Sequence, residues 1–90
     1  MAKNLNALRT VLMDVIAEGA VVINRKKLLL YFGRSQERPS VWSELLDEWV
    51  EIGQARDSLN GLAVADKIVL TLSVDKQGAH TDIQNWANKA

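Results

Sequence analysis

Hydrophobic residues recur at three- and four-residue steps at the start of the chain, which predicts a helix from about Asn4 to Glu18. The apolar positions of this helix are Leu5, Leu8, Val11, Leu12, Val15 and Ile16. Gly19 is expected to end it, because glycine readily adopts the left-handed conformation that closes helices. A short β-branched run at residues 20–23 then predicts a strand long enough for one edge pairing.

Two further helices are predicted in the middle of the chain. Asn24 is a typical N-cap, and the apolar run that follows at residues 28–32 predicts a short, mostly buried helix that closes at Gly33. After a polar connector, the next helix is expected to start near Pro39, with Ser40 as its candidate cap. The apolar stripe of this helix comprises Trp42, Leu45, Leu46, Trp49 and Ile52.

The apolar pattern changes to alternation after Gly53, which predicts a small β ribbon. Asn60-Gly61 is the expected hairpin turn, and Asp66-Lys67 is a candidate second turn. The alternating positions are Leu62, Val64, Ile68, Leu70, Leu72 and Val74. A capping box that begins at Thr81 then predicts a short C-terminal helix over residues 81–89.

Composition narrows the class of protein. The chain has 90 residues, of which 48% are hydrophobic and 24% charged, so we expect one folded domain spanning residues 1–90. Eleven basic and eleven acidic residues give a formal net charge of zero, so any attraction to nucleic acid must be local. The absence of cysteine excludes disulfides, thiolate zinc sites and cysteine nucleophiles.

The chain offers little material for catalysis or for a membrane. We find no apolar run of signal-peptide or membrane-span character, so the expected location is the cytoplasm, without membrane contact. His80 is the only histidine, and it belongs to no pattern typical of a nucleophile, a relay or a metal-ligand set. We therefore expect no enzyme, no metal and no cofactor.

The order of the elements carries a resemblance. The stretch "LLLYFGRS", followed by "SVWSELLDEWVEIG", resembles the helix, glycine turn, helix and closing glycine of the winged helix-turn-helix superfamily. The resemblance covers residues 4–75 and implies an α+β fold, with a winged-helix-like three-helix core, a small antiparallel β ribbon and the short C-terminal helix. The connector from Gly33 to Pro39 is longer than the turn usual for the motif.

A basic cluster stands at the start of the predicted second helix. Arg25, Lys26 and Lys27 follow Asn24, where the positive end of the helix dipole disfavours cations. Free backbone N–H groups at this helix start, together with the three cations, suit a phosphate group. The resemblance implies the same use, since the start of the second helix commonly lies against a DNA strand in winged helices. The alternative is three solvated side chains on an exposed face.

The connector and the start of the third helix hold further candidate DNA contacts. These are Arg34, Gln36, Arg38, Ser40 and Ser43, of which arginine and glutamine can read purine edges. The rest of that helix opposes DNA, because Glu44, Asp47, Glu48 and Glu51 are acidic. DNA binding therefore requires the helix to approach a groove by its tip, with the acidic half turned away.

Two functions follow from these patterns. The first is a small DNA-binding protein, a transcriptional regulator or an accessory factor, that holds double-stranded DNA through the basic cluster, Arg34 and Arg38. The alternative is a protein-interaction module, an adaptor or homodimerisation domain, that docks through the acidic third helix or through Ile83 and Trp86. The C-terminal segment has few apolar anchors, so it is expected either to cover its own domain or to pack on a partner.

Overall fold

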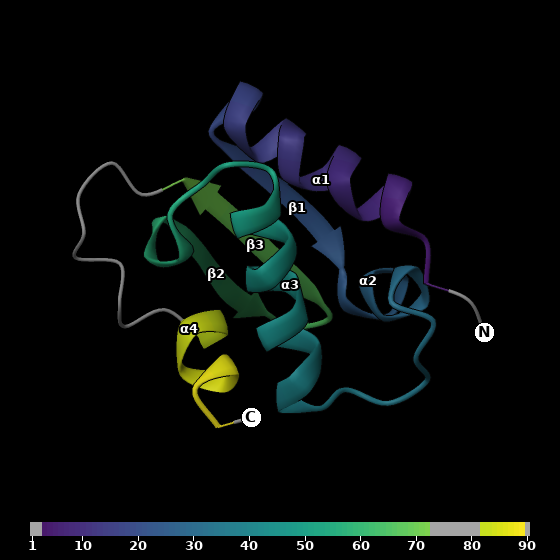
Figure 1. Ribbon diagram of the computed structural model, residues 1–90. Coiled ribbons are helices and arrows are strands. Elements are labelled where there is room, and N and C mark those ends of the chain that lie inside the picture. Colours follow the sequence, from purple (N-terminus) through teal and green to yellow (C-terminus); the bar gives the residue numbers. More distant parts are fainter. Residues whose placement is uncertain (1–2, 73–81, 90) are drawn as a thin grey trace.

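The structure is a computed structural model that describes residues 3–72 and 82–89 (Figure 1). These residues form a small α+β fold with four α-helices and a three-stranded antiparallel sheet. The chain runs through α1 (Leu5–Glu18), β1 (Ala20–Asn24), α2 (Arg25–Tyr31), α3 (Pro39–Glu51), a 3-10 turn η1 (Arg56–Ser58), β2 (Leu59–Val64), β3 (Lys67–Leu72) and α4 (Asp82–Ala87). The expected α+β class is thereby confirmed.

The first two elements follow the local signals closely. The Asn4 side chain caps α1 by accepting a hydrogen bond from the Ala7 N–H at 3.1 Å. Gly19 closes the helix at a φ of 84°, a conformation that L side chains rarely adopt. The predicted strand is β1, an edge strand that pairs with β3 alone. These expectations are confirmed.

Two local predictions for α3 and the sheet are wrong. Ser40 does not cap α3: the N-cap position is Arg38, no side chain caps it, and Pro39 starts the helix. Proline suits that position because its missing N–H would have no helical partner. Asn60-Gly61 does not form the hairpin turn either, since both residues lie inside β2.

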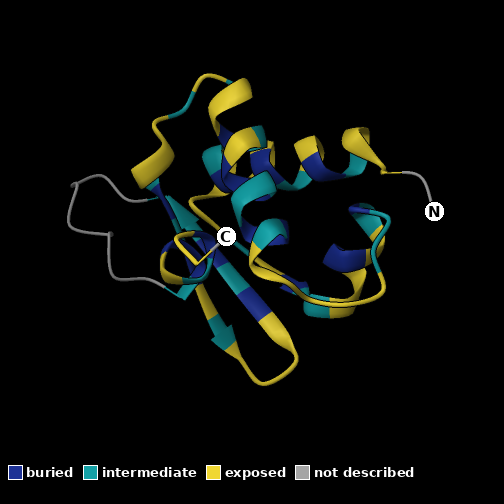
Figure 2. Ribbon diagram, turned by 60° about the horizontal axis from the view of Figure 1, so that its bottom comes forward, coloured by how far each residue is buried: buried dark blue, intermediate teal, exposed yellow. Residues whose placement is uncertain are grey.

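The turn between β2 and β3 lies at Ala65-Asp66, one residue before the candidate second turn. Ala65 has a φ of 55°, and the Asp66 carbonyl accepts a hydrogen bond from the Arg25 N–H at 2.8 Å. This bond ties the hairpin tip to the start of α2. The tip is exposed, as Figure 2 shows.

One hydrophobic core joins the helices to one face of the sheet. Its buried side chains come from α1, α2, α3, all three strands and α4, and include Leu8, Leu12, Ile23, Leu28, Trp42, Leu45, Trp49, Leu59, Ile68, Leu70 and Ile83. In β2 the inward residues are Leu59, Gly61 and Ala63. Leu62 and Val64 consequently point outward and are 50% and 57% exposed, which differs from the half-buried alternation expected for them.

Helix α3 is the central helix of the arrangement. Figure 1 shows it in front of the sheet, with the beginning of the helix between α2 and α4. The residues at its beginning therefore lie close to both the predicted basic cluster and the C-terminal helix.

Candidate functional site

The backbone N–H groups at the start of α2 already have hydrogen-bond partners within the protein. The Arg25 N–H donates to the Asp66 carbonyl, and the Asn24 Oδ1 accepts from the N–H groups of Lys26 and Lys27 at 2.9 and 3.4 Å. The predicted Asn24 cap is confirmed. The expectation of free backbone donors for a phosphate is wrong, because these three amides have partners. Any phosphate here must be held by side chains.

Lys26 and Lys27 place their charges at the surface. Both residues are exposed, and neither forms an ion pair with a carboxylate within residues 3–72 and 82–89. The Lys27 Nζ lies 6.0 Å from the centre of the Tyr31 ring. An aromatic face does not neutralise a cation, so the contact with Tyr31 leaves Lys27 available to an anion.

Arg25 differs from its two neighbours, because it turns inward. Its guanidinium forms a two-pronged ion pair with Glu37 of the connector, at 2.5 and 3.2 Å. It also lies 5.3 Å from the centre of the Trp86 ring of α4. Arg25 thus joins α2, the connector and α4, and Glu37 neutralises its charge.

The candidate DNA contacts of the connector bond mostly to one another or to α3. Arg34 donates to the Ser40 hydroxyl at 3.3 Å and forms an ion pair with Glu44 at 2.8 Å. The Arg38 Nη2 donates to the Gln36 Oε1 at 2.9 Å, which leaves the charge of Arg38 uncompensated. The structure thus brings four of the five candidates into two bonded groups, one with Arg34 and Ser40 and the other with Arg38 and Gln36.

The acidic side of α3 is largely neutralised from other elements. Asp47 pairs with Arg56 of η1, which also donates to the Ser43 hydroxyl at 3.3 Å. Glu48 pairs with Arg9 of α1 at 3.3 Å and with Lys3 at 3.6 Å. With the pair between Arg34 and Glu44, three of the four acidic residues have cationic partners. The sequence shows the acidic residues of this helix, but it does not show which cations from other elements pair with them.

Helix α4 covers its own domain at a seam with β2. Ile83 is fully buried, directly over Gly61. The buried Gln84 side chain donates to the carbonyls of Arg56 and Leu59 at 2.8 and 3.0 Å. Asp82 accepts a hydrogen bond from the Ala63 N–H at 2.9 Å. Of the two expectations for this segment, covering its own domain is the arrangement in the structure. Thr81, its expected cap, lies outside the described residues.

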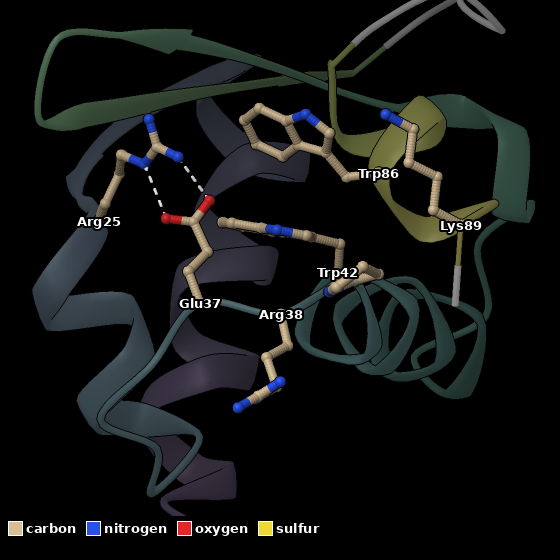
Figure 3. A pocket seen from close by; sticks show the side chains of 7 residues that line it. Arg25, Glu37, Arg38, Trp42, Trp86 and Lys89 are labelled. Carbon is tan, nitrogen blue, oxygen red and sulfur yellow. Dashed lines mark hydrogen bonds and ion pairs between the residues drawn. The ribbon is translucent and has the colours of Figure 1, made fainter.

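Trp86 closes a pocket of about 250 Å³ together with Trp42 of α3 (Figure 3). The two indole rings lie 5.0 Å apart and are tilted by 44°. Pro39 adds a third apolar wall, and the charged side chains that line the pocket are Arg25, Glu37, Arg38 and Lys89. Figure 3 shows the Arg25 and Glu37 pair beside the indoles and the Arg38 guanidinium turned away from them.

Sequence reasoning missed the pocket residues Glu37, Trp42 and Lys89. Trp42 belongs to the predicted apolar stripe and is 2% exposed, and its ring also forms part of the pocket wall. A signal for Lys89 was present, since it follows Trp86 by three positions on a predicted helix and so faces the same side. No local pattern linked Glu37 to Arg25.

The described part of the chain contains neither a group of metal ligands nor a membrane-spanning helix. No group of three or more acidic, histidine or cysteine residues there could hold a metal ion. Within the same residues no helix is both long enough and apolar enough to cross a membrane. His80 lies outside the described residues.

Comparisons with known protein families, with curated proteins and with solved structures found no match to this chain.

Proposed function

We propose that the protein is a small winged-helix domain that binds the backbone of double-stranded DNA. The observation that carries the proposal is the pair of exposed lysines at the start of α2, Lys26 and Lys27, whose charges have no carboxylate partner in the described residues. The element order supports it, because a helix, strand, two helices and a β hairpin follow one another as in winged helices. Phosphate neutralisation by lysine releases counterions, which drives binding without sequence preference.

The ion pairs of α3 make this helix less repulsive to DNA than its acidic sequence suggests. Pairing of Glu44, Asp47 and Glu48 with cations from other elements reduces the repulsion between this helix and phosphate. Near the start of α2 a DNA strand would meet the unpaired cations Lys26 and Lys27, together with the Asp66 carboxylate, which accepts a hydrogen bond from the Asn24 side chain at 3.3 Å and has no ion pair in the described residues.

The same contacts argue against extensive base reading. Ser40 and Ser43 accept hydrogen bonds from arginines, and Gln36 accepts one from Arg38. Side chains already bonded within the protein must release those partners before they bond to a base. We therefore propose that the domain chiefly contacts phosphates, as an accessory factor or a regulator whose specificity comes from elsewhere.

The alternative of a protein-interaction module has less support. Docking through Ile83 and Trp86 would require α4 to leave Gly61 and Trp42, since Ile83 is fully buried and the two indoles pack together. Docking through the paired acids of α3 would require partners to displace four intramolecular ion pairs. Homodimerisation stays a prediction.

The test is fluorescence anisotropy of a labelled duplex of random sequence, titrated across a salt series with a Lys26→Gln/Lys27→Gln variant. Wild type should bind with an affinity that falls steeply with salt. The variant should lose affinity on every duplex, and the slope of log K against log salt should become shallower by about 1.8, at about 0.9 per phosphate contact.

A matched control removes two cations that are already paired. Arg9→Gln/Arg56→Gln lowers the net charge equally but leaves the start of α2 intact. The control should keep the wild-type slope and lose less affinity than the lysine variant, because the acids whose partners it removes, Glu48 and Asp47, lie on α3 and not at the start of α2. Equal losses in both variants, or no binding by the wild type at low salt, would overturn the proposal.

A further inference from the structure

The pocket between α3 and α4 has an aromatic floor that is open to solvent. Trp42 is almost wholly buried, whereas Trp86 is half-buried, so part of the Trp86 ring faces the pocket. Pro39 extends the apolar surface. A surface of this kind takes a flat ring, because stacking on an aromatic side chain suits any planar π system.

The charges around this floor are predominantly positive. Three cations and one carboxylate line the pocket, and the carboxylate, Glu37, is held by Arg25. That leaves Arg38 and Lys89, neither of which forms an ion pair within the described part of the chain. Figure 3 shows the Lys89 amine directed toward the side of the pocket that holds Trp86. An anionic group attached to a flat ring on Trp86 would therefore meet Lys89, whereas the Arg38 guanidinium is turned away from the indoles.

We propose that this pocket binds a single unpaired nucleotide, with its base against Trp86 and its phosphate at Lys89. The ligand chemistry is an aromatic base that carries a phosphate, either as a free nucleotide or as an unpaired residue of a DNA strand. The strand source rests on the proposed function, whereas the free-nucleotide source does not. A nucleotide in a regular duplex cannot enter, because its base is stacked and paired.

The first experiment follows the indole N–H signal of Trp86 by NMR while deoxyadenosine monophosphate is added to the full chain. The signal should shift in a saturable manner. Deoxyadenosine, which lacks the phosphate, and inorganic phosphate, which lacks the ring, should each bind at least about tenfold more weakly, since a charged hydrogen bond or a stacked base is worth about that factor.

Lys89→Gln tests the phosphate contact, because Lys89 is exposed and its removal disturbs no buried contact. This variant should bind the nucleotide about tenfold more weakly. Lys67→Gln is the matched control, since Lys67 is an exposed lysine at the start of β3 that does not line the pocket. An unmoved Trp86 signal, or equal affinities in Lys89→Gln and wild type, would overturn the inference.

A second arm separates the two sources and the two proposals. A phosphorylated tetrathymidylate should bind more tightly than thymidine monophosphate if a strand is the source, and its binding should also weaken in Lys89→Gln. Nucleotide binding without duplex binding would support the pocket and overturn the proposed function. Duplex binding without nucleotide binding would overturn the pocket alone.

Discussion

Two regions of the molecule are stabilised by different interactions. One is the seam between α4 and β2, and the other is the start of α2. At the seam, Ile83 lies fully buried over Gly61 and Gln84 bonds to two carbonyls. At the start of α2, Asn24 satisfies the backbone locally and Lys26 faces solvent. The seam is a packing contact between distant segments, whereas the helix start is a local arrangement that leaves charge available.

The tertiary contacts of these two regions explain why two predictions from the sequence are wrong. Asn60-Gly61 has the composition of a turn, but Gly61 is needed for the close approach of Ile83 in the fold. The basic cluster has the composition of a phosphate cradle, but Asn24 and Asp66 already occupy its amides. Local sequence composition favours one structure or ligand, and tertiary contacts determine whether that structure forms or that ligand can bind.

The largest effect is expected at the seam, from Gly61→Ala. The added Cβ would lie 1.9 Å from the Ile83 Cδ1 and 2.2 Å from its Cγ1, so the Ile83 side chain or α4 must shift. We expect a loss of about 3 kcal/mol in the free energy of unfolding, as for an overpacked core. Urea denaturation followed by circular dichroism measures it.

A double-mutant cycle with Ile83→Ala sharpens this test. Ile83→Ala alone should cost about 2–5 kcal/mol through the cavity it leaves. In that background Gly61→Ala should cost almost nothing, because the new methyl group enters the vacated space. Additive losses would contradict the proposed close approach.

Gln84→Met is the next largest expected effect. Methionine keeps the length of the side chain but leaves the carbonyls of Arg56 and Leu59 without their donor. Burial of unpaired polar groups should cost about 1–3 kcal/mol in the free energy of unfolding. A variant as stable as wild type would show that Gln84 is not an anchor of α4.

Asn24→Ala tests the other region through its backbone. Loss of the N-cap should cost about 1 kcal/mol, visible as a fall of about 4–8 °C in the melting temperature. Asn24→Ser keeps a capping oxygen and should retain most of the stability. Equal melting temperatures for alanine and serine would contradict the capping role.

Glu37→Gln should have the smallest effect on stability, about 0.2–1 kcal/mol, because the ion pair is partly exposed to solvent. Its effect on binding should have the opposite sign to that of the lysine variants. Release of Arg25 adds one available cation, so duplex affinity at low salt should rise. A fall in duplex affinity would mean that the pair positions the DNA-binding surface.

The sequence predicted elements whose signals are local. Asn4, Gly19 and Asn24 bound their helices as expected, because caps act within three or four residues of the chain. The contact of Gly61 with Ile83 and the pair of Arg25 with Glu37 were not predictable in this way. Both depend on how separate elements meet, and a single sequence contains no periodicity that reports it.

The same limit applies to the candidate site. The exposed lysines were identifiable from the sequence because the Asn24 cap and the charged residues that follow it are neighbours along the chain. The pocket was not, since Trp42 and Trp86 come from helices that meet only in the folded chain. Lys89 of this pocket follows Trp86 by three positions, the spacing of neighbours on one face of a helix. That spacing indicates a shared site only once Trp86 is known to contact Trp42.

The most direct test of the central claim is amide chemical-shift mapping of the ¹⁵N-labelled protein with a short duplex at low salt. We predict that the largest changes fall on Lys26, Lys27 and Arg38, with the amides of β2 at the seam unchanged. Changes confined to the seam or to the outward face of the sheet at Leu62 and Val64, or no changes at all, would contradict it.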